Sequence, residues 1–313
     1  MHHIGYLLTE GFQIMGLATQ AVFEHANEAA GEEFYRMRNY SVEGGEVSSS
    51  LGMRVSTEKA TASATIDTWV VCGVANPLEF PASAAERAFL QRAAKKARRI
   101  AGICTGGFVL AEAGLLARRR ATTHWAFAQA MRARFPEIQV EDDRIYIVDG
   151  ALWTSAGMTA GLDLALAMVG KDLGDEAARS VAHKMVMHQH RAGGQSQHSE
   201  MLALAPKTDR IQDALNYARS HLKRALTVEE LAAQANLSAR QFTRVFTAET
   251  GLSPAKAIEG LRLEAARLMI EQSRHPLEVV ARETGFRDRR HMREVFLRGF
   301  GVAPQSLRRE GRA

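Results

Sequence analysis

Short apolar runs alternate with longer amphipathic stretches through the first 170 residues of the chain. The short runs are rich in β-branched and aromatic residues and predict strands at Ile4–Leu8, Phe34–Met37, Thr65–Val71, Arg99–Cys104, Ile145–Val148 and Leu152–Thr154. The longer stretches place Leu, Ala and Met at helical spacing and predict helices at Leu17–Ala29, Ala84–Arg98, Thr105–Leu116, Trp125–Arg134 and Thr159–Val169. Alternating elements of this kind predict an α/β fold whose mostly parallel sheet is covered by helices on both faces.

The pattern changes after this region. Val47–Val55 predicts a short extra pair of strands, Glu176–Met187 predicts a further helix, and the Gly-rich polar stretch 191–207 predicts a linker. Beyond it every pattern is helical, at Asp209–His221, Thr227–Gln234, Ser238–Thr250, Pro254–Glu271, Leu277–Thr284 and Arg289–Arg298. We therefore expect a body at 1–190, a linker at 191–207 and an all-α domain at 208–313.

The all-α segment contains one pattern twice. The first copy runs from Leu231 to Pro254 and the second from Val280 to Pro304, with front halves that match at an offset of 49 residues and back halves at 50. Each copy predicts a short helix, a turn and a longer helix, which is the arrangement that places a second helix in the major groove of DNA. The repeat predicts a protein that contacts DNA twice.

In the first copy, Thr227 and Ser238 stand where N-caps are expected, and Phe242, Val245 and Phe246 share the inner face of the second helix. The opposite face presents Arg240, Gln241, Thr243 and Arg244. Arg and Gln can each bond bidentately to base edges, so this face is the predicted reader. The competing interpretation is a helical bundle with solvated arginines.

The second copy carries Arg289, Arg290, His291 and Arg293 on its predicted outer side, and Glu294 matches Arg244 of the first copy. Glu294 can accept from a cytosine amino group or orient a neighbouring arginine, whereas the arginines can also contact phosphates, which position a protein without specifying sequence. The helix predicted at Pro254–Glu271 would be about 25 Å long. We expect it to hold the two copies near the ~34 Å spacing of successive major grooves.

Charge is concentrated in the same segment. From Lys207 onward 20 Lys and Arg stand against 13 Asp and Glu, so this part carries +7 and the rest of the chain −2 of the overall +5. A basic domain on a near-neutral body predicts double-stranded DNA as the partner. Two cysteines cannot build a disulfide framework, and no leader or apolar run of about 20 residues is present, so we expect a soluble cytoplasmic protein.

Several short motifs connect the all-α segment with a known family. They are Leu231-Ala232, Ser238 with Phe242 and Phe246, Gly251-Leu252-Ser253-Pro254, Arg262-Leu263, Gly285-Phe286, and Gly301-Val302 with Pro304. With these motifs the span from about 208 to 309 resembles the AraC-family DNA-binding domain. Arg287-Asp288-Arg289-Arg290 replaces the small residues usual after Gly285-Phe286, so the operator sequence cannot be inferred from relatives. The resemblance implies a transcriptional regulator, more often an activator than a repressor, with RNA polymerase as a further partner.

In the body, a predicted strand runs into Gly102-Ile103-Cys104-Thr105-Gly106 and then a helix. This Gly-x-Cys-x-Gly turn has the form of a nucleophile elbow, which exposes its central side chain. At a helix N-terminus we expect Cys104 to have a lowered pKa that favours the thiolate. His124, some twenty residues later, is a candidate base, and a Cys–His pair could catalyse acyl transfer or hydration of an electrophile.

The span from Gly102 to Trp125, with Ala111-Glu112-Ala113-Gly114 inside it, resembles the ThiJ/PfpI branch of the class I glutamine amidotransferase-like superfamily. Thr154-Ser155-Ala156-Gly157 and the later Gly193-Gly194-Gln195-Ser196-Gln197 are similar to the GlxA-type regulators, which fuse such a domain to AraC-type DNA-binding units. The resemblance covers nearly the whole chain. It implies a flavodoxin-like body and a homodimer.

The body departs from catalytic relatives in two places. Thr105 follows the cysteine where protease-like relatives have His, and Gly16 stands where other relatives place an acid, with Glu10 too early in the loop. Cys104 and His124 are therefore expected to be vestigial, so that the body is no enzyme and binds no cofactor. The alternative is a Cys-dependent hydrolase or hydratase fused to a DNA-binding tail.

We expect the former active site to bind a small, nitrogen-containing effector. Its predicted lining is Gly73, Val74, Cys104, Thr105, His124 and Trp125. The elbow amides could bind a carboxylate and Trp125 a cationic amine, unless Trp125 packs in the core; Cys72 is expected to be a core residue. The histidines at 183, 188, 190 and 198 lack the spacing and partners of a zinc site, so no metal is predicted. A third possibility is a body that serves only as a dimer scaffold for constitutive DNA binding.

Overall fold

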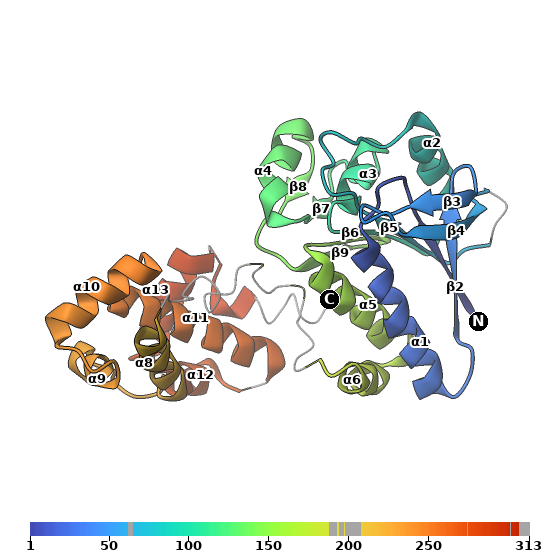
Figure 1. The fold of residues 1–313 in the computed structure, drawn as a ribbon. Helices are drawn as coiled ribbons and strands as arrows, with labels where there is room; N and C mark the ends of the chain where they lie inside the picture. Colours follow the sequence, from blue (N-terminus) through green and yellow to red (C-terminus); the bar gives the residue numbers. More distant parts are fainter. Residues whose placement is uncertain are drawn as a thin grey trace. The chain divides into compact units, whose positions relative to one another are not determined.

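The computed structural model describes residues 1–61, 65–187, 193, 197, 208–273, 275–300 and 302–306. The chain divides into two compact units, Met1–Gln197 and His198–Ala313 (Figure 1). This division falls inside the predicted linker at 191–207, most of which lies outside the described residues. Gly193 and Gln197 are the two described residues of that stretch, and both contact the first unit.

The first unit is built on one eight-stranded sheet in the order β3-β4-β2-β1-β5-β6-β10-β9. The strands from β4 to β10 in that order pair in parallel, whereas β3 and β9 are antiparallel edge strands. Their bounds are β1 His2–Leu7, β2 Tyr35–Ser41, β3 Gly45–Ser48, β4 Arg54–Lys59, β5 Thr68–Cys72, β6 Arg99–Ile103, β9 Tyr146–Asp149 and β10 Leu152–Ser155. β7 (Arg120–Ala121) and β8 (Gln139–Val140) form a separate short ladder.

Helices cover both faces of this sheet, as the alternating pattern predicts (Figure 1). Side chains of successive strand residues point to opposite faces, so Tyr6 and Val70 enter one core and Leu7 and Val71 the other. The first core is closed by α1 (Thr19–Ala30), α5 (Met158–Leu173) and α6 (Asp175–Lys184). The second is closed by α2 (Ala84–Ala93), α3 (Gly106–Glu112) and α4 (Trp125–Arg134). A short 3₁₀ segment, η1 (Ile14–Ala18), precedes α1.

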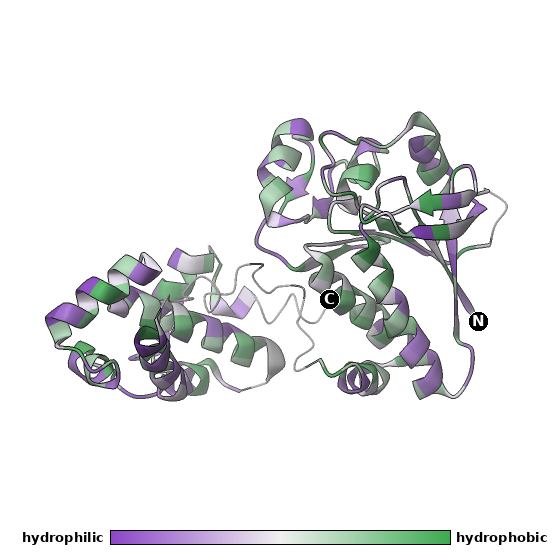
Figure 2. Ribbon diagram, viewed as in Figure 1, coloured by the Kyte–Doolittle hydropathy of each residue, from purple (hydrophilic) through white to green (hydrophobic). Residues whose placement is uncertain are grey.

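The second unit is helical, as predicted. It contains α8 (Asp209–Ser220), α9 (Val228–Gln234), α10 (Ala239–Thr250), α11 (Pro254–Gln272), α12 (Leu277–Glu283) and α13 (Arg289–Phe300). Two apolar cores lie within it, one among α8, α9 and α10 and one among α12 and α13. Figure 2 shows the resulting alternation of hydrophobic and hydrophilic residues along these helices. None of the helices in the described residues is long and apolar enough to cross a bilayer.

α11 joins the two cores. Ala257 and Leu261 in its first half pack into the first core, and Ala266 and Ile270 in its second half pack into the other. At 1.5 Å per residue its 19 residues extend over about 28 Å. One continuous helix therefore holds two helix–turn–helix units, as the repeat predicts.

Candidate functional site

The first helix–turn–helix unit is shaped by local backbone chemistry. The Thr227 hydroxyl accepts the Glu230 amide at the start of α9, and Ser238 forms a reciprocal capping box with Gln241 at the start of α10. Between the helices Asn236 has φ +52°, a left-handed conformation that Asn tolerates better than most residues. In the second copy Gly285, at φ +78°, occupies the matching turn. The two copies thus share a turn as well as a sequence pattern.

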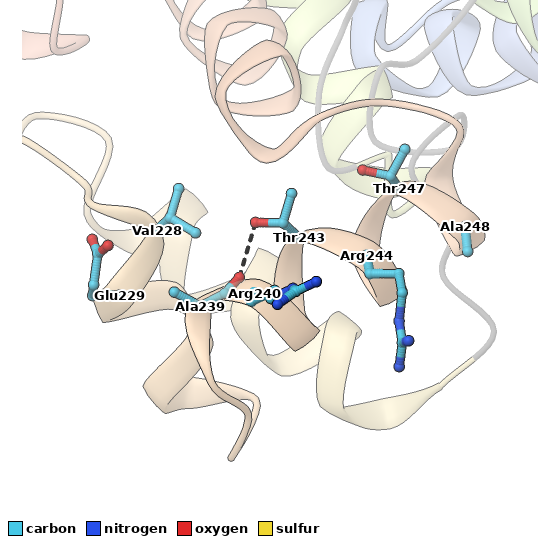
Figure 3. A pocket seen from close by; sticks show the side chains of 8 residues that line it. All are labelled: Val228, Glu229, Ala239, Arg240, Thr243, Arg244, Thr247 and Ala248. Carbon is cyan, nitrogen blue, oxygen red and sulfur yellow. Dashed lines mark hydrogen bonds between the residues drawn. The ribbon is translucent and has the colours of Figure 1, made fainter.

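An open hollow runs between α9 and α10, lined by Val228, Glu229, Ala239, Arg240, Thr243, Arg244, Thr247 and Ala248. Figure 3 shows Arg240 and Arg244 extending from α10 along this surface. Both side chains are exposed. Within the described part of the chain neither forms an ion pair, so their guanidinium groups are available to an external partner.

The other two predicted readers are partly committed to the protein. The Gln241 Oε1 atom accepts from the Ser238 backbone amide at 3.2 Å and from its hydroxyl at 2.9 Å. The Thr243 hydroxyl donates to the Ala239 carbonyl at 2.9 Å (Figure 3). A bidentate contact from Gln241 to adenine would therefore have to break the capping box.

In the second helix–turn–helix unit the predicted cations differ in their partners. Arg289 pairs with Glu278 at 2.8 Å, and Arg290 pairs with Glu294 at 3.1 Å, whereas Arg293 is exposed and has no ion pair among the described residues. Glu294 therefore orients a neighbouring arginine, one of its two predicted roles. His291 was expected on the outer side, but it is half-buried with its ring 5.5 Å from that of Phe286, because the helix turns this position toward the core.

Sequence reasoning missed what Arg262 and Arg267 of α11 do. Arg262 donates to the backbone carbonyls of Leu222 at 3.2 Å and Arg224 at 2.7 Å. Arg267 is buried, with its guanidinium carbon 4.7 Å from the centre of the Phe300 ring. Both arginines hold the helix–turn–helix units together.

In the first unit, β6 enters α3 through Cys104, whose φ of +56° is the strained conformation expected at a nucleophile elbow. The predicted thiolate is wrong. Cys104 is 5% exposed, and burial raises the pKa of its thiol to about 11 although hydrogen bonds from Thr105 act in the opposite direction. Loss of water around the sulfur thus outweighs any help from the N-terminus of a seven-residue helix.

The elbow packs directly against the loop after β5. The Thr105 hydroxyl donates to the Val74 carbonyl at 2.6 Å, and a Cβ atom on Gly73 would collide with Thr105. Gly73, Val74, Cys104 and Thr105 are all buried, so the structure brings these four predicted residues together. They form a tightly packed base rather than an exposed surface.

His124 and Trp125 lie at the start of α4, on the loop Thr122–Trp125. We call this loop the rim, because the Thr123 hydroxyl donates to the Cys104 carbonyl at 3.1 Å and so places it beside the elbow. His124 Nδ1 accepts from the Ala126 amide at 3.3 Å, and burial lowers the pKa of His124. A neutral ring that accepts at Nδ1 carries its proton on Nε2, so in this state Nε2 is a donor and not a base. No hydrogen bond joins Cys104 and His124 in the described structure.

Trp125 is 54% exposed, which excludes the core-packing alternative for its ring. Its ring centre lies 5.5 Å from that of His124, so the rim presents two adjacent aromatic rings. Cys72, in contrast, is fully buried, and burial raises the pKa of its thiol to about 12. Cys72 is the core residue that the sequence predicts.

The loop after β1 provides no acid near the cysteine. A Cβ atom on Gly16 would lie 2.8 Å from Cys72 Sγ, so an acidic side chain does not fit at this position. Glu10 is exposed and accepts from the Ser48 amide at 3.2 Å, which ties it to β3. Among the described residues no group of three or more His, Cys, Asp or Glu could hold a metal ion. His188, His190 and His198 lie outside the described residues.

One polar residue beside the rim was absent from the predicted site. The Gln197 carboxamide donates to the Thr123 carbonyl at 2.8 Å and accepts from the Trp125 amide at 2.9 Å. The sequence signal was the polar motif Gly193–Gln197, which composition assigns to a linker. No pattern of period or charge distinguishes a hydrogen-bonded glutamine from a solvated one.

A parallel sheet with a cysteine elbow, followed by two helix–turn–helix units on a shared helix, defines a class of DNA-binding protein with an enzyme-like body. The model of the DJ-1/PfpI family matches residues 11–171, and a helix-turn-helix domain model matches residues 231–310. The HTH-type transcriptional regulator GlxA of Rhizobium meliloti is 30% identical over 315 residues, covering 99% of this chain and 96% of GlxA. The chain therefore belongs to the DJ-1/PfpI family and, within it, to the transcriptional regulators that carry an AraC-type helix–turn–helix domain.

Two further similarities concern the body. The crystal structure of an AraC family transcriptional regulator from Pseudomonas putida is 22% identical with a TM-score of 0.54, covering 59% of this chain and all of that one. This likeness confirms the flavodoxin-like fold of the first unit. The isonitrile hydratase of Pseudomonas putida is 41% identical over 93 residues, which are 30% of this chain and 40% of the hydratase.

Proposed function

We propose that this regulator is an effector-responsive activator that reads an operator mainly through α10 and senses a small, nitrogen-containing molecule at the rim of its first unit. The observation that carries the sensing proposal is an elbow kept without its catalytic set. Cys104 retains the left-handed elbow conformation, but its thiol is protonated at neutral pH, no hydrogen bond joins it to His124 among the described residues, and Gly16 leaves no room for an acid. A site that keeps the elbow turn and loses its catalytic set is suited to binding without turnover.

The rim supplies the recognition chemistry of this proposal. The half-exposed Trp125 ring beside His124 can bind a cationic nitrogen through a cation–π contact. The buried residues Gly73, Val74, Cys104 and Thr105 are joined to this loop through the hydrogen bond from Thr123 to the Cys104 carbonyl. A homodimer of the first unit and contact with RNA polymerase complete the proposal, and both follow from the family rather than from the described contacts.

A thermal-shift screen tests the effector. The full chain is heated with amino acids, betaines and polyamines, and a ligand that binds the folded state raises the melting temperature. For a cationic hit we expect Trp125→Ala to abolish the shift and Leu297→Ala, which removes a 41% exposed apolar side chain from α13, to preserve it. If no compound in the panel shifts the melting temperature, the body is better explained as a dimer scaffold.

Selection from random duplexes tests the DNA reader. Full-length protein should enrich a sequence with two blocks one helical turn apart, since each chain carries two units on α11. Arg240→Ala and Arg244→Ala should each relax base preference within one block only. Enrichment that both variants leave unchanged would exclude α10 as the reader.

The similarity to isonitrile hydratase favours a second candidate function, hydration or hydrolysis of an electrophilic substrate by Cys104. Cys104→Ser separates the two functions. A regulator keeps effector binding and operator response in this variant, because neither needs a thiolate. If wild-type protein turns over an isonitrile or ester and the variant loses turnover and operator response together, the protein is an active enzyme and the sensor-only proposal is wrong.

A further inference from the structure

The half-buried side chain of Gln197 forms hydrogen bonds with both ends of its carboxamide. Its Oε1 atom accepts the backbone amide of Trp125 at 2.9 Å. Its Nε2 group has four oxygen acceptors, which are Thr123 O at 2.8 Å, Asp142 O at 2.8 Å, Thr122 Oγ1 at 3.1 Å and Arg144 O at 3.2 Å. Two loops of the first unit, 122–125 and 142–144, therefore meet at this one side chain. We call the four oxygens and the Trp125 amide the carboxamide seat.

The carboxamide seat requires a side chain that donates at one atom and accepts at its neighbour. The Nε2 group carries two hydrogens, which face the oxygens of the seat, whereas Oε1 faces an N–H group. A glutamate would place a second acceptor against three backbone carbonyls, and a lysine could not accept the Trp125 amide. The seat therefore matches a primary carboxamide.

The carboxamide seat lies at the start of α4, where the first backbone amides have no acceptor within the helix. Gln197 accepts the amide of Trp125, the first residue of α4. The ring of His124 accepts the next amide, that of Ala126, at 3.3 Å, and the His124 carbonyl accepts that of Phe127 at 2.9 Å. Of the two rings of the rim, one is thus held through its own nitrogen and the other through its backbone bond to Gln197.

A second residue of the same stretch also lies against the first unit. The Gly193 carbonyl accepts the amide of Tyr146, the first residue of β9, and a Cβ atom on Gly193 would lie 2.6 Å from the Tyr146 ring. The backbone amide of Gln197 in turn donates to Asp143 Oδ1 at 3.2 Å. Gly193 and Gln197 are therefore both bound to the segment that leads into β9, although composition predicts a linker here.

We propose that Gln197 is a positioning residue of the rim: its carboxamide fixes the backbone of Trp125 at the start of α4 and so holds the indole ring where it binds a cationic nitrogen. Gln197 acts through Trp125 and not by touching the effector. Thr123 extends this effect to the elbow, because its carbonyl accepts from Gln197 and its hydroxyl donates to the Cys104 carbonyl. This inference rests on the proposed function, since it names what orients the same rim.

Hydrogen exchange at the Trp125 amide, followed in the full chain with peptides spanning 122–127, tests the carboxamide seat. Gln197→Ala should exchange about tenfold faster than wild type at Trp125, because the acceptor of this amide is removed. Acetamide, which has the same donor and acceptor, should slow this exchange again in Gln197→Ala, whereas N,N-dimethylacetamide, which has no N–H group, should not. The matched control is Gln91→Ala, which removes an Nε2 hydrogen bond to the Ala113 carbonyl and should leave Trp125 unchanged. Equal exchange in Gln197→Ala and wild type, or equal effects of the two amides, would overturn the seat.

The second measurement tests whether the carboxamide seat orients the rim for binding. The probe is tetramethylammonium chloride, whose affinity for the full chain is obtained by saturation-transfer difference NMR. Trp125→Ala should weaken binding about threefold, as expected for an exposed cation–π contact. Gln197→Ala should weaken it about twofold, and acetamide should restore it. The melting temperatures of Gln197→Ala and Gln91→Ala should be equal, because the role of Gln197 is local.

The two measurements separate the inference from the proposed function. If Trp125→Ala weakens binding of the probe and Gln197→Ala does not, the positioning role is refuted while the proposed cation site stands. If wild type and Trp125→Ala bind the probe equally, the rim is no cation site, and the positioning role fails together with that part of the proposed function. The exchange measurement then still decides whether the carboxamide seat exists.

Discussion

Replacing Arg244 gives the sharpest test of how α10 recognises DNA. The side chain is exposed and has no ion pair in the described residues, so its removal disturbs no contact that holds the unit together. A bidentate contact between an arginine and guanine contributes about 1–3 kcal/mol of discrimination. Arg244→Ala should therefore weaken binding to the selected duplex by about 5- to 150-fold.

Lysine and a second arginine provide the matched comparisons. Arg244→Lys keeps the charge and loses the fork, so a base contact is lost whereas a phosphate contact survives. Arg290 carries the same charge in the second helix–turn–helix unit. It is paired with Glu294 at 3.1 Å, and 87% of its side chain is exposed. Arg290→Ala should weaken binding by less than about tenfold, and Arg290→Lys should have little effect.

Fluorescence anisotropy with the selected duplex, and with duplexes changed at one base pair at a time, measures each affinity. For Arg244→Ala, one base pair should lose its preference while the others keep theirs. The reasoning is refuted if Arg244→Lys binds like wild type, or if Arg290→Ala weakens binding as much as Arg244→Ala. Either result would mean that charge and not the fork is recognised.

Four further predictions concern the scaffold. Because burial raises the pKa of Cys104 to about 11, only about one thiol in a thousand is ionised at pH 8, and alkylation by iodoacetamide, followed by mass spectrometry, should rise about tenfold per pH unit up to pH 10. The same raised pKa means that the contribution of this thiol to stability is complete below about pH 9 and is lost as the pH rises toward 11. Asp172→Ala should lower the free energy of unfolding, measured in urea, by about 3–5 kcal/mol. The substitution removes the carboxylate that lies 2.5 Å from the Arg99 guanidinium, and the Arg99 side chain is only 4% exposed. A loss below about 1 kcal/mol would show that water replaces this ion pair. Asn236→Gly should leave the melting temperature nearly unchanged. Gly285→Asn should lower it by several degrees, because a Cβ atom at position 285 would collide with the Leu222 carbonyl. Equal effects of the two substitutions would show that the two turns are packed alike.

Elements with strong local signals were predictable from the sequence. Caps and apolar periodicity set the starts of α9, α10 and α11 within one residue, and α4 begins and ends where its pattern predicts. Extent was harder to predict where polar residues continue an element. β2 runs to Ser41 instead of ending at Met37, because pairing with β1 and β4 sustains a strand that hydrophobicity does not mark, and α2 ends at Ala93 instead of Arg98, since the chain must turn into β6.

The elbow residues of the predicted site lie close together, but the ionisation predicted for Cys104 was wrong. The elbow residues do gather with Gly73 and Val74, since the carboxyl ends of neighbouring parallel strands meet at one edge of a sheet. The pKa of Cys104 depends on how much water reaches the sulfur, which is a property of tertiary packing that spacing does not encode. The contacts of Gln197 and the pairing of Arg290 with Glu294 likewise depend on which side chains meet in space.

The carboxylates that pair with Arg289 and Arg290 have a consequence for how this protein searches along DNA. Glu278 and Glu294 act as intramolecular counterions of these arginines. A DNA phosphate that approaches therefore competes with a carboxylate whose local concentration is fixed by the fold. When the second helix–turn–helix unit binds DNA of arbitrary sequence, fewer counterions are therefore released than its number of arginines would suggest. We therefore expect the second helix–turn–helix unit to bind random DNA weakly and to dissociate from it quickly, and to contribute fully only where the first helix–turn–helix unit has bound its bases.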